Sequence, residues 1–86
     1  SCALSVPLHR MRITAAPWDP EAPTHQLAIV QCHAKEGRRG PAIQEAERMK
    51  KAFGPGSKWW GKQDGWAKKE ARGLVHQAEG LARGGG

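Results

Sequence analysis

The sequence has 86 residues, a formal net charge of +6, and hydrophobic residues at 38% of its positions. A chain of this length forms at most one small domain, which argues against an enzyme with a deep, closed substrate pocket. No apolar run approaches the roughly 20 residues that a membrane-spanning helix requires, so a transmembrane segment is excluded.

Core-forming residues are scarce, because Leu, Ile, Val and Phe together number only twelve. This scarcity predicts partial disorder, whereas four tryptophans are enough to anchor a small core or an interface. The positive charge is concentrated between Arg48 and Arg72, where eight basic residues stand against two acidic ones. Such a segment attracts nucleic-acid phosphates, anionic lipid or an acidic protein surface.

Residues 1–40 are predicted to be an extended, basic, proline-containing arm with one or two short strands. Arg10 to Ala16 alternate loosely between apolar and polar residues and form one candidate strand. Pro17 to Pro23 contain three prolines, which interrupt regular structure. His25 to His33 have β-branched residues at their centre and form the second candidate strand.

The next segment is predicted to be a helix from Pro41 to Phe53. Gly40 can serve as its N-cap, proline is favoured at the first helical position, and Gly54 followed by another proline ends the pattern. The apolar stripe expected to face a core comprises Ala42, Ala46, Met49 and Phe53, with Ile43 at its margin.

A second helix is predicted from about Gly65 to Arg83, with Asp64 as its N-cap. Its apolar side is rich in alanine, which allows close approach of another helix but buries little surface. Residues 41–83 are therefore predicted to form a helix-turn-helix-like hairpin, followed by a disordered tail at 84–86. The predicted fold class is α+β or mostly α, with an irregular amino-terminal half and two amphipathic helices at about 41–53 and 65–83.

The cysteines and histidines show no metal-binding or catalytic pattern. Cys32 and His33 are adjacent, whereas zinc ligands in small domains are usually paired a few residues apart. We therefore predict no catalytic residue, no metal site and no cofactor. The sequence leaves open whether Cys2 pairs with Cys32. The low cysteine content favours a reducing compartment inside the cell, and the acid-free composition of Ser1 to Pro17 is similar to that of mitochondrial or plastid targeting segments.

The segment KWWGKQDGWAKK, from Lys58 to Lys69, holds three of the four tryptophans among four lysines. Lysines neutralise phosphates and indoles stack on bases, so this segment is predicted to contact single-stranded nucleic acid, with RNA favoured over DNA. The same tryptophans could instead be packing anchors or docking residues. The candidate nucleic-acid or anion-binding residues are Lys50, Lys51, Lys58, Trp59, Trp60, Lys62, Trp66, Lys68, Lys69 and Arg72.

The leading functional prediction is a small, basic structural or accessory component of a larger complex, such as a ribonucleoprotein or an organellar ribosome. The alternative is a non-catalytic interaction module that docks its two helices and tryptophans on an acidic partner protein. The helix at 65–83 could also lie on an anionic membrane. Trp60–Gly61 and Gly65–Trp66 resemble the tryptophan–glycine pairs of Argonaute-binding hooks, although those hooks lie in long, lysine-poor tracts with many copies.

Overall fold

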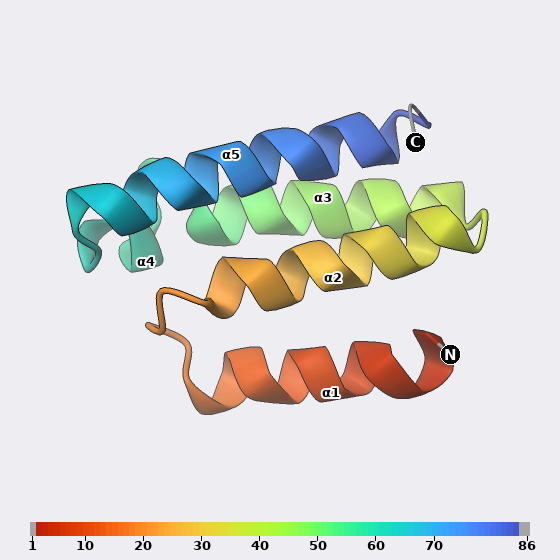
Figure 1. The fold of residues 1–86 in the computed structure, drawn as a ribbon, viewed down its shortest axis with the longest axis horizontal. Coiled ribbons are helices and arrows are strands. Elements are labelled where there is room, and N and C mark those ends of the chain that lie inside the picture. The colour runs from red at the N-terminus through yellow and green to blue at the C-terminus, as the bar shows by residue number, and fades with distance from the viewer. Residues whose placement is uncertain (1, 85–86) are drawn as a thin grey trace.

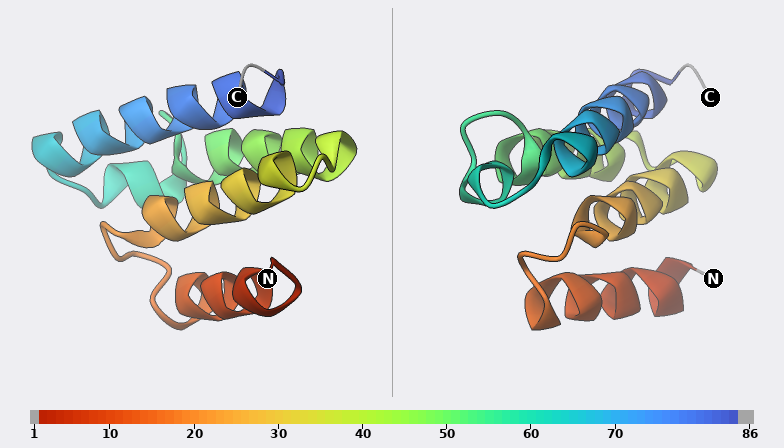
Figure 2. Two further views of the ribbon diagram at one scale, coloured as in Figure 1. Left: turned by 45° about the vertical axis from the view of Figure 1, so that its right-hand side comes forward. Right: turned by 60° about the vertical axis from the view of Figure 1, so that its left-hand side comes forward.

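The computed structural model describes residues 2–84, and every regular element within this range is helical (Figure 1). The elements are α1 (Cys2–Ala15), α2 (Ala22–Lys35), α3 (Arg39–Phe53), the short α4 (Lys58–Gly61) and α5 (Gly65–Ala82). The four long helices run back and forth along the long axis of the molecule (Figures 1 and 2). Helices α2, α3 and α5 pack against one another, and α1 lies against the outer side of α2.

The core lies between α2, α3 and α5 and is closed at one end by α4. Its larger side chains include Leu27, Met49, Phe53 and Trp59, all of which are buried. The contribution of α5 is mainly alanine together with Val75, so this helix can approach its neighbours closely. The buried residues of the core cluster are Ala22, Leu27, Val30, Ala46, Met49, Phe53, Trp59, Ala71, Val75, Ala78 and Ala82.

The two helices predicted in the carboxy-terminal half are present, with bounds that differ from the prediction by one or two residues. Helix α3 begins two residues earlier than predicted, so Pro41 lies in its first turn, where backbone N–H groups have no intrahelical acceptor. The Asp64 side chain caps α5 by accepting a hydrogen bond of 2.9 Å from the Ala67 amide. Of the predicted tail, Gly84 follows α5 in a turn, and residues 85–86 lie outside the described residues.

The prediction of strands and of an irregular amino-terminal half is wrong, because Cys2–Ala15 and Ala22–Lys35 are helices. In α1, apolar residues occur on two opposite sides. Leu4, Leu8 and Met11 form an exposed stripe, while Ile13 packs against the core. Two apolar stripes on opposite sides of one helix hide the 3.6-residue period. The resulting pattern is similar to the alternation of a strand, which explains the wrong prediction.

Helix α2 was mistaken for a strand for a different reason. It contacts α1, α3 and α5, so it is buried on several sides, and Ile29 and Val30 are both fully inaccessible. A helix buried on several sides has no clear amphipathic period, and β-branched residues at its centre then favour a strand prediction. Pro23 does not interrupt the helix, because it occupies the first turn.

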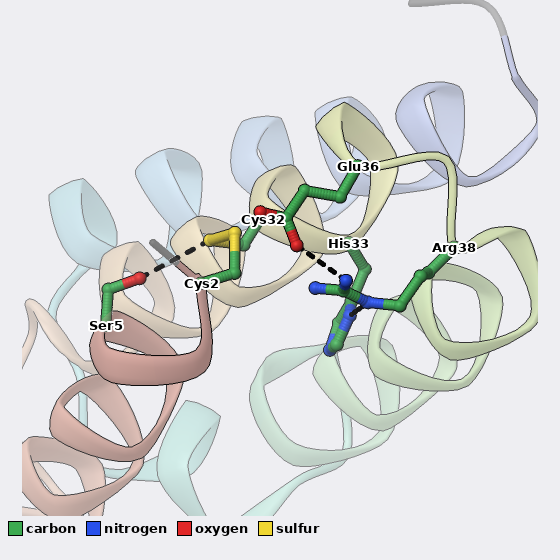
Figure 3. The surroundings of a disulfide bond; sticks show 6 residues. All are labelled: Cys2, Ser5, Cys32, His33, Glu36 and Arg38. Carbon is green, nitrogen blue, oxygen red and sulfur yellow. Dashed lines mark hydrogen bonds and ion pairs between the residues drawn. A yellow bond between two sulfur atoms is a disulfide. The ribbon is translucent and has the colours of Figure 1, made fainter.

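A disulfide bond between Cys2 and Cys32 joins the start of α1 to the end of α2 (Figure 3). The structure therefore pairs the two cysteines, a question that the sequence left open. The Ser5 hydroxyl lies 3.4 Å from the Cys32 sulfur and can donate a hydrogen bond to it. Beyond the bond, Arg38 closes the α2–α3 turn by donating to His33 Nδ1 at 3.0 Å and pairing with Glu36 at 2.5 Å. We call this end of the bundle the disulfide end.

Candidate nucleic-acid interface

All four tryptophans lie at the end of the bundle opposite the disulfide end. Trp18 is in the connection between α1 and α2, two tryptophans are in α4, and Trp66 is in the first turn of α5. These segments come together where α4 meets the start of α5 (Figure 1). We call the connection at residues 16–21 together with residues 58–72 the tryptophan end.

Trp59 is a packing anchor and is not available to a ligand. Its side chain is 2% exposed, and its ring meets Phe53 edge-on with centroids 5.3 Å apart. Its indole N–H donates a hydrogen bond of 2.9 Å to the carbonyl oxygen of Asp19. This bond satisfies the polar atom of a buried indole and ties α4 to the α1–α2 connection. Trp59 therefore cannot stack on a base in this fold.

Trp60 is half-buried and packs against the core. The Arg72 guanidinium lies 5.6 Å from the centroid of its ring, within cation–π range. Ser57 begins this short helix by accepting a hydrogen bond of 3.1 Å from the Trp60 amide. The fold thus brings together two predicted site residues, Trp60 and Arg72, from different helices.

Trp18 belongs to the tryptophan end, although sequence reasoning did not include it among the site residues. It is 47% exposed, and the Lys62 ammonium lies 4.8 Å from its ring centroid. Gln63 holds the backbone in place by donating a hydrogen bond of 2.9 Å to the Trp18 carbonyl. Gln63 is 45 residues away from Trp18 in the sequence, and Lys62 directly precedes Gln63. No local pattern could reveal their proximity.

Trp66 is the most exposed tryptophan, at 69%. It follows the cap of α5 directly, and its neighbour Ala67 takes the buried position on that turn. Lys69 and Arg72 are exposed on the next turns of the same helix, and Lys68 is half-buried. An indole that faces water here adds nothing to the core and offers a flat surface for stacking.

The three remaining predicted residues lie on α4 and α3. Lys58 is exposed on α4, within the tryptophan end. Lys51 is exposed on the last turn of α3. Lys50 faces α5, where its ammonium lies 3.8 Å from a Glu79 carboxylate oxygen. Lys50 is thus partly neutralised and lies apart from the tryptophans.

The fold lowers the local charge that the sequence alone indicates. Five basic residues in the segment 58–72 are joined by Asp19 and Glu21, which the chain brings from its amino-terminal half, and by Asp64 and Glu70. Two of these carboxylates bind backbone amides: Asp19 accepts from Glu21 at 2.7 Å and Asp64 caps α5. The tryptophan end is therefore only weakly positive, and its distinguishing feature is exposed indole surface beside lysines.

A buried polar network lies away from this end, between α1, α2 and α3. The Gln26 amide donates to the Glu45 carboxylate at 2.9 Å and to the Glu45 carbonyl at 3.0 Å. Arg10 adds a hydrogen-bonded ion pair to the same carboxylate. Burial alone would raise the pKa of Glu45, but the hydrogen bonds from Arg10 and Gln26, with the charges of Arg10 and Arg48, lower it. The network gives Gln26 and Glu45 the partners that buried polar groups require.

No metal-binding group of three or more His, Cys, Asp or Glu residues occurs within residues 2–84. In the same range, no helix is long and apolar enough to cross a bilayer. Comparisons with protein-family models, curated proteins and solved structures found no match for this chain. By fold and surface, it is a small, basic, disulfide-linked helical bundle with an aromatic end.

Proposed function

We propose that this chain is a small, basic accessory protein of a larger assembly, and that its tryptophan end contacts unpaired nucleotides. The proposed nucleic acid is RNA rather than DNA, as in a ribonucleoprotein or an organellar ribosome. The observation that carries the proposal is the exposure of Trp66 and of Trp18, the latter with the Lys62 ammonium 4.8 Å from its ring. Stacking of a base on such a ring contributes about 1–3 kcal/mol.

The weak local charge shapes the proposed mode of binding. Lysines beside the rings would neutralise a few phosphates, while the indoles would supply the larger part of the affinity. Each neutralised phosphate of a single strand contributes about −0.7 to the slope of log affinity against log salt. We therefore expect the affinity to depend only weakly on salt, with a slope that corresponds to about two or three neutralised phosphates. Double-stranded RNA should bind less well, because its bases are not free to stack.

The proposed role is non-catalytic and requires no cofactor. An organelle such as a mitochondrion or plastid is the proposed location, on the composition of residues 1–17. In a reducing compartment Cys2 and Cys32 would be thiols, and α1 would be held by its noncovalent contacts with α2 and α3, including the Arg10–Glu45 ion pair.

Docking on an acidic partner protein is the alternative. The apolar faces of α3 and α5 are already packed inside the bundle, so this alternative rests on the exposed tryptophans and lysines of the same end. RNA and an acidic protein would then compete for one surface. The two proposals differ in stacking, because RNA binding requires an unpaired base on the exposed indoles, whereas docking of an acidic protein does not.

The test is fluorescence anisotropy of a labelled single-stranded RNA, titrated with the protein at two salt concentrations. Trp66→Ala and Trp18→Ala should each weaken binding about 5- to 100-fold. Lys62→Ala should weaken binding less and make the salt dependence shallower. Arg83→Ala is the matched control, since it removes one exposed positive charge at the disulfide end.

Three results would count against the proposal. If no complex forms at low salt, the RNA partner is wrong. If Lys62→Ala and Arg83→Ala weaken binding equally, the attraction is a general effect of net charge. If both tryptophan variants bind as tightly as the unmodified protein, the indoles do not contact the bases, and an acidic protein partner becomes the better proposal.

A further inference from the structure

Two histidines from different helices lie side by side where α1 meets α2. The Nδ1 atoms of His9 and His25 are 3.0 Å apart, and their ring centroids are 5.2 Å apart. Both side chains are half-buried, so solvent can reach them. A hydrogen bond between two imidazole nitrogens needs a single shared proton, because one ring must donate and the other must accept.

The distance between these nitrogens suits a metal ion in place of the proton. Bonds from zinc to imidazole nitrogen are about 2.0–2.1 Å long, which puts two nitrogens about 3.3–3.4 Å apart at a tetrahedral centre. Neighbouring nitrogens in a square-planar complex with bonds of similar length are about 2.9 Å apart. The observed separation of 3.0 Å lies between these values. The centroid separation of 5.2 Å shows that the two Nδ1 atoms face each other nearly end-on, so both rings must turn before their lone pairs converge on one metal ion.

The two rings are held in register by contacts on both sides of them. The Cys2–Cys32 bond fixes α1 against α2 at one end, and the ion pair of Arg10 with Glu45 fixes the residue next to His9. Ligands that rigid helices bring together lose little conformational freedom when a metal binds. The two helix backbones are thus already in place, and metal binding requires rotation of the side chains only.

A small hollow of about 240 Å³ is lined by His25 but not by His9, and it leaves room for further ligands on the His25 side of the pair. Arg12 and Asp19 line this hollow, so it presents one positive and one negative group. The Arg12 guanidinium opposes a cation, so it reduces the affinity of the pair for a metal ion. Water molecules can complete the coordination, because the hollow is open to solvent.

We propose that His9 and His25 form a two-imidazole site for a divalent transition-metal ion of the Zn²⁺, Ni²⁺ and Cu²⁺ class. Imidazole nitrogen is a preferred ligand of these ions, whereas Mg²⁺ prefers oxygen. Two protein ligands are fewer than the four of a structural zinc site, so binding is reversible and is not required for folding. The sequence did not reveal this site, because its ligands are 16 residues apart and meet only across two helices.

Protonation of the histidines competes with metal binding. Burial and the charges of His25 and Arg12 lower the pKa of His9. Metal ligands must be unprotonated, so protons and metal ions compete for the same nitrogens. Metal binding should therefore weaken on acidification.

The test is thermal unfolding of tag-free protein, followed by circular dichroism with ZnCl₂, NiCl₂ or MgCl₂. Zn²⁺ and Ni²⁺ should raise the melting temperature progressively with concentration, and Mg²⁺ should not. His9→Gln and His25→Gln should each reduce the apparent affinity by at least about tenfold. His76→Gln is the matched control, since His76 is exposed on α5, and it should respond like the unmodified protein.

Nuclear magnetic resonance of the unmodified protein gives a second readout that does not depend on the folding of a variant. Paramagnetic Ni²⁺ should broaden the ring signals of His9 and His25 together, at lower concentrations than those of His33 and His76. The proposal is overturned if all four histidines broaden in parallel. It is also overturned if Zn²⁺ raises the melting temperature of His9→Gln and His25→Gln as much as that of the unmodified protein.

Discussion

Glu45 is a buried residue whose carboxylate accepts hydrogen bonds from two other side chains. Its carboxylate is buried between helices and satisfies the side chain of Gln26, which is buried too. Glu45→Ala would leave the Gln26 amide short of an acceptor and Arg10 without its partner. We expect a loss of about 2–4 kcal/mol in the free energy of unfolding, measured by chemical denaturation.

Glu47→Ala is the control for this substitution, because Glu47 is exposed two residues further along α3. It should change the free energy of unfolding by no more than about 0.5 kcal/mol. If both variants lose the same free energy of unfolding, the effect comes from removing any carboxylate from α3 and not from disrupting the buried network.

Protonation of His9 and Glu45 should make stability depend on pH in one direction. Both pKa values are lowered in the folded protein, so the unfolded chain takes up protons first as pH falls. Stability should therefore decrease below about pH 6.5 through His9 and again below about pH 4.5 through Glu45. Urea unfolding from about pH 7.5 to about pH 3 measures this, and His9→Gln should remove the first decrease only. Stability that rises on acidification would contradict both pKa directions.

At the scale of single elements, replacing two glycines by alanine should change stability in opposite directions. Gly54 follows the end of α3, and Gly73 lies inside α5. A Cβ at Gly54 would lie 2.4 Å from the Lys50 carbonyl oxygen, so the chain leaving α3 would have to move. A Cβ at Gly73 would meet nothing within 4 Å, and alanine is the better helix former. We expect Gly54→Ala to destabilise the fold by about 1–3 kcal/mol and Gly73→Ala to stabilise it by up to about 1 kcal/mol.

Thermal and urea unfolding of the two variants provide the measurement. Since the same side chain is added in both, any general effect of alanine on the unfolded chain is shared. Destabilisation by Gly73→Ala would mean that α5 is not a continuous helix at that position in solution.

Helices α3 and α5 could be predicted because their signals are local: an amphipathic stripe, Asp64 as a cap, and Gly54 as a stop. Helices α1 and α2 could not, because what makes them helical is their place in the bundle. Burial of α2 on several sides removes its period. Helix α1 packs through Ile13 and through polar and covalent contacts, while its leucines face water. Interactions of this kind override local propensity.

The candidate site was predictable in part for the same reason. Trp66 and its neighbouring lysines are contiguous in the sequence, so their pattern was visible. Burial of Trp59 and proximity of Trp18 to Lys62 depend on the α1–α2 connection meeting α4. Contacts over such separations leave no trace in a single sequence.

At the scale of the whole molecule, α1 depends on the disulfide bond more than the other helices do. The bond spans a sequence separation of 30 residues, and closing a loop of this size stabilises a fold by about 3–4 kcal/mol. Reduction should therefore lower the denaturant midpoint. The double variant Cys2→Ser and Cys32→Ser should have the midpoint of the reduced protein and should not respond to reductant. Equal midpoints for the untreated and reduced protein would show that the bond is absent in solution.

The placement of the tryptophans at one end has a consequence for how unfolding is observed. Indole emission reports on the α1–α2 connection, α4 and the start of α5, while the disulfide end contains no tryptophan. Local opening near Cys2 and Cys32 would leave the emission unchanged and still reduce the helical dichroism. Agreement between the two signals would therefore show that this bundle unfolds as one cooperative unit, and a fluorescence transition that comes later would show that the disulfide end opens first.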